Sequence, residues 1–167
     1  LEIFYPRALQ EKTALREKLG IPSNTKVVLS PRRLTPSMNH NIILKAFSQY
    51  TKSGEVEAVL VFRKFGYFSY ALEDELRDQA VSLGINEKVI WLKEIDYDQL
   101  PILYSLADLV INIPERDGLP VTLFEVSACM TPIITSDLPA YHGYCSEGAY
   151  FFVGVEDTKG IEKLMNL

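Results

Sequence analysis

Residues 114–125 combine the residue types that could bind a phosphorylated ligand. The segment follows an apolar stretch typical of a strand and turns at Asp117-Gly118. It continues into a run typical of a helix, with Pro120 in its first turn. Backbone N–H groups of a first helical turn have no partner inside the helix and favour anions. The pattern therefore indicates a phosphate site, although an Asp-Gly turn before a helix is also an ordinary connection.

Glu125 is the second chemical signal. It is the only charged residue between Pro120 and Ser136, and its neighbours are mostly apolar. A carboxylate in such surroundings is rarely buried without a partner. Hydroxyl groups of a ligand could be that partner, whereas a Glu that simply points to water is the alternative. Taken with the turn and the helix start, Glu125 indicates a phosphorylated ligand that carries hydroxyl groups.

The composition bounds the class of protein. The chain has 167 residues, of which 47% are hydrophobic and 23% charged, as in an ordinary globular domain. Its net charge of −5 argues against a general nucleic-acid binder, but a few local cations would suffice for a small anion. The two cysteines have no metal-ligand spacing, so we expect no metal. No apolar run approaches the roughly 20 residues of a membrane span. Without a signal-like start, we expect a cytoplasmic location.

Short β-branched runs alternate with longer helix-period runs along the chain, which predicts an α/β fold. We expect three layers, with a six-stranded parallel sheet flanked by helices. The predicted strands cover residues 26–30, 56–62, 88–92, 108–113, 132–135 and 150–155. The predicted helices cover residues 8–19, 38–53, 70–83, 97–106, 120–129 and 158–166. We expect a single domain over residues 1–167, in which residues 1–23 can form a lead-in helix.

Basic residues follow each of the first three predicted strands. They are Arg32 and Arg33, then Arg63 and Lys64, then Lys93. In an open parallel sheet, ligands bind outside the carboxyl ends of the strands, so these cations should share an edge with the glycine turn. This arrangement suits a diphosphate even though the whole chain is acidic. The alternative is that the loops are simply polar.

Three blocks of sequence, in order and at ordinary spacing, carry a family resemblance. Residues 27–36 resemble a strand followed by a "GRL" loop, and residues 83–108 resemble the block "LGL…NVxFxG…LxxxYxxADxxV". Residues 117–137 resemble "EGxxxxxxEAMACGxPVxxSD". These blocks resemble the retaining glycosyltransferases of family 4. The likeness covers about residues 20–157 and implies the Rossmann-like, donor-binding C-terminal domain of the two-domain GT-B fold. The N-terminal acceptor domain is then expected to lie outside this chain.

The resemblance implies a role for each candidate residue. Glu125 would accept hydrogen bonds from the ribose hydroxyls of a nucleotide-sugar, Asp117 would lie near the sugar ring, and Arg33 would pair with the diphosphate. These three are the predicted catalytic residues. The other predicted donor-binding residues are Lys64, Ile95, Gly118, Leu119, Pro120, Val121 and Thr122. Lys64 would assist at the diphosphate, and the main chain at Ile95 would hold the base.

The activity implied is the transfer of a sugar from a nucleotide-sugar to a glycan, a lipid-linked sugar or a small molecule, with retention of configuration. No metal or other cofactor is expected, and no nucleic-acid partner. We expect this chain alone to bind nucleotide weakly and to be inactive. Any membrane contact should come through the acceptor domain.

The sequence departs from the family pattern near the diphosphate. Met38 stands where a lysine is usual, Arg32 replaces a glycine, and Met130 replaces the glycine that ends a helix. Arg32 or Lys64 could supply the missing cation, and the sequence leaves this choice open. A catalytically degenerate binding or scaffold module is therefore the alternative function. His40 is expected at the surface or as a helix cap rather than in catalysis.

Overall fold

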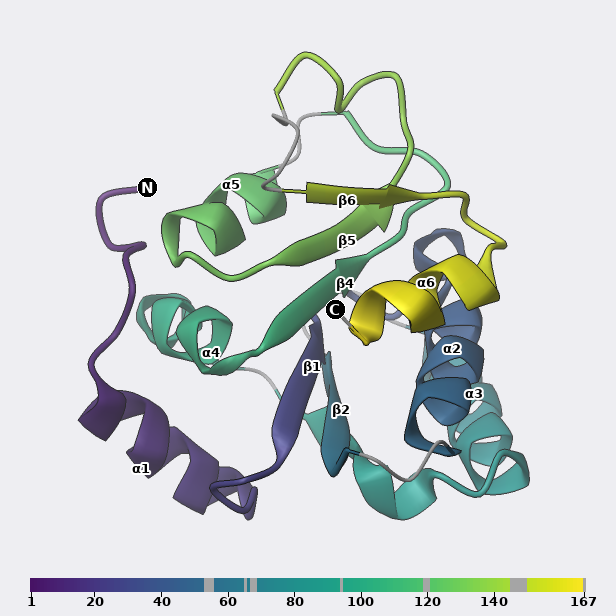
Figure 1. The fold of residues 1–167 in the computed structure, drawn as a ribbon, viewed down its shortest axis with the longest axis horizontal. Coiled ribbons are helices and arrows are strands. Elements are labelled where there is room, and N and C mark those ends of the chain that lie inside the picture. Colours follow the sequence, from purple (N-terminus) through teal and green to yellow (C-terminus); the bar gives the residue numbers. More distant parts are fainter. Residues whose placement is uncertain are drawn as a thin grey trace.

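The computed structural model describes residues 1–52, 56–64, 66, 69–93, 95–118, 121–144 and 150–166. Within these residues, six strands form one parallel sheet in the order β3-β2-β1-β4-β5-β6 (Figure 1). The strands are β1 (Lys26–Ser30), β2 (Ala58–Arg63), β3 (Val89–Leu92), β4 (Leu109–Asn112), β5 (Ile133–Ser136) and β6 (Tyr150–Val153). The prediction of a six-stranded parallel α/β domain is confirmed. The strand order reverses between β1 and β4, where doubly wound sheets bind ligands.

The described residues also form six α-helices and three 3-10 turns. The helices are α1 (Leu9–Leu19), α2 (His40–Lys52), α3 (Tyr70–Ser82), α4 (Leu100–Leu106), α5 (Val121–Ala128) and α6 (Thr158–Met165). The 3-10 turns are η1 (Pro36–Met38), η2 (Asn86–Lys88) and η3 (Tyr97–Gln99). None of the described helices combines the length and the apolar character that a bilayer crossing requires.

Two predicted helices begin later than the sequence pattern suggested, for backbone reasons. The predicted helix 38–53 starts at His40, because Asn39 has a left-handed φ of 54° that a helix cannot contain. The predicted helix 97–106 is divided into η3 and α4. Pro101 has no N–H to donate to the carbonyl four residues earlier, so the α-helical hydrogen bonds begin only beyond it.

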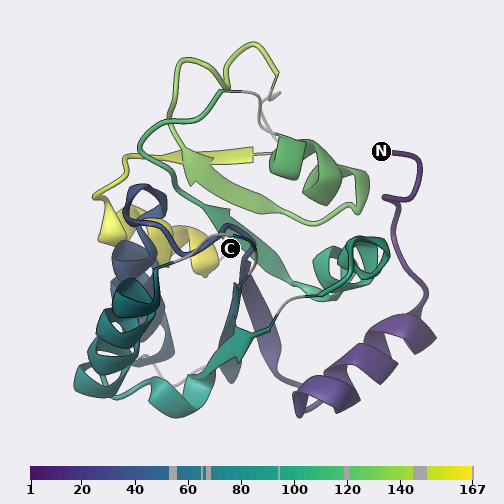
Figure 2. The ribbon, with the colours of Figure 1, turned by 180° about the vertical axis from the view of Figure 1, so that it is seen from behind.

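The helices cover the sheet on both faces. Helices α2, α3 and α6 lie on one face and α1, α4 and α5 on the other, as the two opposite views show (Figure 1, Figure 2). The core is accordingly split into two apolar clusters. In β1, Val28 belongs to the cluster under α2 and α3, whereas Val27 and Leu29 belong to the cluster under α4 and α5. This alternation follows from the two-residue period of a strand and explains why the strands are apolar on both faces.

Helix α5 ends in a conformation that is unusual for its residue. Met130 has a φ of 59° and is exposed, directly after the last turn of α5. The left-handed region costs an L-residue with a Cβ roughly 1–2 kcal/mol, a cost that glycine avoids. The chain therefore keeps the backbone path of a helix-ending glycine without the glycine itself.

Candidate functional site

The loops that follow β1 and β4 are tied together at the carboxyl edge of the sheet. Asn39 donates a side-chain hydrogen bond of 2.9 Å to the carbonyl of Ile113, and the backbone N–H of Glu115 donates to the carbonyl of Ser37 at 2.9 Å. Asn39 is buried, so its bond is shielded from water. These bonds fix the segment that leads from β4 towards α5, where the sequence places the acidic pair.

Asp117 and Arg32 form an ion pair across this edge. The Nη1 atom of Arg32 lies 3.0 Å from Oδ2 of Asp117, and both side chains are largely shielded, at 19% and 14% exposure. The hydroxyl of Tyr141 donates to the same oxygen at 2.8 Å, and the N–H of Gly118 donates to Oδ1 at 2.9 Å. The first acidic residue of the motif is therefore held on both oxygens.

Glu125 lies one turn inside α5 and is 7% exposed. The hydroxyl of Tyr104 donates to Oε2 at 3.3 Å, and that of Tyr97 donates to Oε1 at 3.4 Å. A hydroxyl bound firmly to a carboxylate usually lies at 2.5–2.7 Å, so both bonds are long. No Lys or Arg pairs with Glu125 among the described residues. A carboxylate can accept about four hydrogen bonds, so Glu125 keeps unused acceptor capacity.

Burial raises the pKa of Glu125 because the charged form loses hydration. The hydrogen bonds from Tyr104 and Tyr97 act in the opposite direction, as does the positive charge of Arg63 at the end of β2. Burial outweighs them. A ligand that donated shorter hydrogen bonds would relieve this cost, so the site is chemically suited to a donor such as a diol.

Arg33 is exposed directly after β1, and its guanidinium makes no ion pair within the described part of the chain. Its backbone is held by His40, whose Nε2 lies 3.0 Å from the carbonyl of Arg33. Nδ1 of His40 lies 3.2 Å from the hydroxyl of Ser30. The expectation of a surface or capping histidine is wrong: His40 is 2% exposed, and burial lowers its pKa to about 4. The neutral ring thus fixes the loop that presents Arg33.

Lys64 is engaged by a buried carboxylate. Its Nζ lies 3.0 Å and 3.1 Å from the two oxygens of Glu73, which is 6% exposed. Arg77, one turn later in α3, also pairs with Glu73. Burial acts to raise the pKa of Glu73, but the bonds from Arg77 and Lys64 outweigh it and the pKa is lowered. Much of the charge of Lys64 is therefore compensated within the protein.

The other predicted donor-binding residues that the structure describes follow β3 and β4. Ile95 is half-buried just before η3, with its side chain packed against the apolar cluster under α4 and α5. Gly118 is exposed, and Val121 and Thr122 form the start of α5. The predicted residues Leu119 and Pro120 lie outside the described residues.

Four polar residues at this edge were missed from sequence. Tyr97, Tyr104 and Tyr141 supply the hydroxyls that hold Glu125 and Asp117, yet each reads as an ordinary aromatic in the sequence. Asn112, at the carboxyl end of β4, is buried, and its side-chain atoms have no hydrogen-bond partner among the described residues. An Asn inside an apolar strand was a usable signal for this position.

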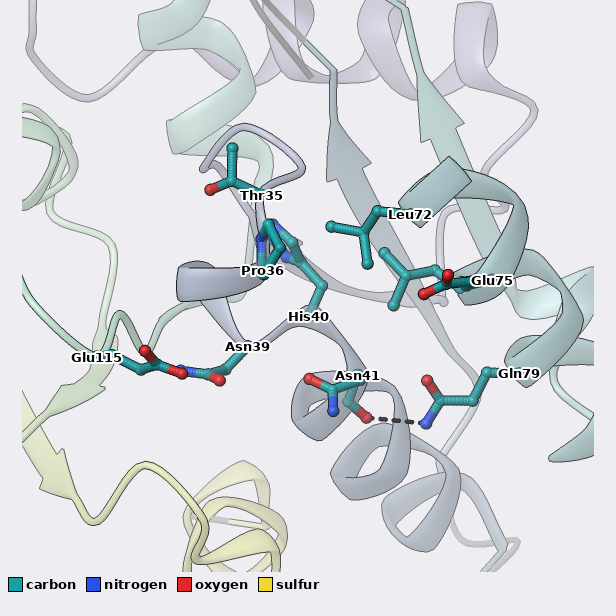
Figure 3. Close-up of a pocket in the computed structure, with 10 residues that line it drawn as sticks. Thr35, Pro36, Asn39, His40, Asn41, Leu72, Glu75, Gln79 and Glu115 are labelled. Carbon is teal, nitrogen blue, oxygen red and sulfur yellow. Dashed lines mark hydrogen bonds between the residues drawn. The ribbon is translucent and has the colours of Figure 1, made fainter. Parts of the chain in front are cut away.

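A neighbouring cavity of about 290 Å³ lies beside η1 and α3 (Figure 3). Its lining includes Glu75 and Glu115, and a hydrogen bond of 3.0 Å joins Gln79 to the carbonyl of Asn41. None of the predicted donor-site residues that the structure describes lines it. The described lining has no Lys or Arg to offset its two carboxylates, unlike the edge that holds Arg32 and Arg33, so this cavity is a poor site for a diphosphate.

Comparisons with known proteins identify the family and the fold of this chain. A sequence model of the family described as "Glycosyl transferases group 1" matches residues 11–166. The O-antigen chain mannosyltransferase RfbU of Salmonella typhimurium is 33% identical over 94 residues, which are 56% of this chain and 26% of that protein. The alpha-monoglucosyldiacylglycerol synthase of Streptococcus pneumoniae is 28% identical over 149 residues, 87% of this chain and 32% of that protein.

Among solved structures, HepE of Anabaena in complex with UDP and glucose is similar in fold. The TM-score is 0.84 at 20% sequence identity, and the match covers 97% of this chain and 43% of that one. The chain thus spans only 26% and 32% of the two curated relatives that it matches, and 43% of the solved structure.

Proposed function

The chain belongs to the group 1 glycosyl transferases, and from this premise we propose that it is the donor-binding domain of a retaining, family 4 enzyme. The substrate bound here is a nucleotide-sugar, and the sugar passes to an acceptor held by another domain. The names of the relatives, which refer to an O-antigen chain and to a diacylglycerol lipid, support a glycan or lipid-linked acceptor. UDP and glucose in the complex of a structural neighbour support a nucleotide-sugar donor.

The state of Glu125 carries the proposal. Its carboxylate is 7% exposed, and its two hydroxyl donors lie at 3.3 Å and 3.4 Å. A ribose offers two adjacent hydroxyls, which are the donors that this carboxylate lacks. Its place one turn into α5, at the carboxyl edge of a doubly wound sheet, is where such sheets bind nucleotides.

The proposed chemistry follows from the charge that develops on the leaving group. When the bond between the sugar and the diphosphate breaks, negative charge grows on the leaving phosphate. The exposed guanidinium of Arg33 and the N–H groups at the start of α5 would stabilise that charge. Loss of one such donor typically costs on the order of a hundredfold in rate. The proposal requires no metal ion.

Nucleotide binding tests the proposal. We expect the chain to bind at least one of UDP, GDP and ADP in a calorimetric or amide-shift titration. Glu125→Gln should weaken that affinity by about 10- to 100-fold, the usual value of hydrogen bonds to a charged acceptor. The same variant should not affect binding of the 2′,3′-dideoxy nucleotide, which has no diol.

Glu115→Gln is the matched control, because Glu115 is an exposed acid in the segment between β4 and α5. It should leave both affinities unchanged. If none of the three nucleotides binds to the correctly folded chain, the proposal is wrong. In the longer enzyme, the anomeric configuration of the product tests retention.

One observation favours a second candidate, a degenerate binding or scaffold module. Asp117 is held by Arg32, Tyr141 and Gly118, and Lys64 is held by Glu73, so two predicted ligands of the donor are already engaged. If Glu125→Ala leaves the rate of sugar transfer by the longer protein unchanged, Glu125 does not bind the donor, and the module is favoured over the donor site.

A further inference from the structure

The cations at the carboxyl edge of the sheet differ in their ion-pair partners. Lys64 is compensated by buried Glu73. Arg33 and Arg116 are exposed, without an ion pair among the described residues. Arg32 differs from all three, because it is largely shielded and yet fixed by an anion that also sits at this edge.

The position of Arg32 is set by the sheet topology. Arg32 follows β1 and Asp117 follows β4, and these two strands are neighbours at the point where the strand order reverses. The crevice outside the strand ends at such a point is where ligands bind. The ion pair between residues 85 positions apart therefore stands at the mouth of the proposed donor site.

The guanidinium of Arg32 has donors to spare. An arginine carries five N–H groups in a rigid plane, and one of them, on Nη1, meets Asp117. Within the described part of the chain, no other acceptor takes a hydrogen bond from this side chain. A planar fork held on one side and unused on the other is suited to the oxygens of a phosphate.

We propose that Arg32 is a second diphosphate-binding arginine, held in place by Asp117 and Tyr141. The inference rests on the proposed donor site and adds a residue to it. Asp117 is then a positioning residue: it holds Arg32, and Tyr141 holds Asp117 through the same oxygen at 2.8 Å. The ion pair would hold the guanidinium of Arg32 in a fixed orientation toward the phosphate.

A mutant cycle with UDP, GDP and ADP tests this role. These probes carry no transferable sugar, so a contact between Asp117 and the sugar cannot contribute. Arg32→Met should weaken the affinity for the diphosphate that binds best by about tenfold, as expected for a lost charged hydrogen bond. It should leave the affinity for the corresponding nucleoside unchanged. Asp117→Asn should weaken diphosphate binding severalfold, but should add nothing in the Arg32→Met background.

Arg116→Met is the matched control, because it removes the same charge from an exposed position beside Asp117. It should change the affinity by less than twofold at physiological salt, where exposed charges are screened. Circular dichroism of each variant checks the fold. The double variant Arg32→Met, Asp117→Asn removes both charges, so no unpaired buried carboxylate confuses the comparison.

Two results would overturn the inference alone. In the first, the unaltered chain binds the diphosphate and Arg32→Met binds it no worse than Arg116→Met does. In the second, Asp117→Asn tightens binding or acts independently of Arg32. Failure of the unaltered chain to bind any of the three nucleotides would instead overturn the proposed function, and this inference with it.

Discussion

Replacement of His40 by glutamine should remove a pH-dependent part of the stability. His40 is 2% exposed, and burial lowers its pKa from the ordinary 6.5 to about 4. Its Nε2 donates to the carbonyl of Arg33, and Nδ1 accepts from Ser30, as the neutral ring permits. Glutamine cannot titrate, so the difference in stability between the two chains isolates the imidazole.

The sign and size follow from the two pKa values. Between pH 6.5 and 4 the unfolded chain binds a proton at this histidine that the folded chain refuses, so folding becomes less favourable as the pH falls. The contribution of neutral His40 to the free energy of unfolding is complete above pH 6.5 and is lost below pH 4. A shift from 6.5 to about 4 corresponds to about 3 kcal/mol in total, of which about 2 kcal/mol is lost between pH 7 and pH 5.

Urea unfolding at pH 7, 6 and 5, at constant ionic strength, measures the effect. His40→Gln should be less stable than the unaltered chain at pH 7, and the gap should narrow by about 2 kcal/mol at pH 5. Carboxylates that titrate in this range are present in both proteins and cancel in the difference. His142→Gln is the control, because His142 is the other of the two histidines in the chain and is exposed. A gap that stays constant from pH 7 to pH 5 would refute the reasoning.

Two further predictions concern the same edge of the sheet and the end of α5. Nucleotide affinity should fall as the pH is lowered through the raised pKa of Glu125, because the protonated carboxyl accepts fewer hydrogen bonds. Titrations at several pH values should show that Glu125→Gln has lost this pH dependence of the affinity. An equal slope of affinity against pH in both chains would contradict the prediction. Met130→Gly should raise the free energy of unfolding by about 1 kcal/mol, because glycine adopts a φ of 59° without strain. Equal stability of the two chains in urea unfolding would argue against strain at Met130.

The sequence predicted the sheet because strand periodicity is a local property. In β1, apolar residues face both ways, and this alone indicates a strand covered on two sides. Prediction was weakest where a single residue decided the start of a helix, through the positive φ of Asn39 and the missing N–H of Pro101. A helix boundary that depends on one residue is not resolved by a periodicity that is averaged over a window of the sequence.

Glu125 could likewise be chosen from sequence, because a lone charge in an apolar helix is costly and therefore informative, whereas Asp117 was chosen from the family resemblance. Glu125 is buried, as that reasoning required. What the sequence could not provide was the set of partners. Tyr97 and Tyr104 reach Glu125 from another connection, and a hydroxyl on an aromatic ring carries no signal of its direction.

By itself, then, the sequence determined the order of strands and helices along the chain, the edge of the sheet at which cations gather, and the identity of the buried acid. The tertiary structure decided which charges are compensated and which are held in a fixed position. It pairs Lys64 with Glu73 and Arg32 with Asp117, and it buries His40 against the loop of Arg33. The physical reason is that charge pairing depends on distances between residues far apart in the chain, which only the packed sheet and helices bring within a few ångströms.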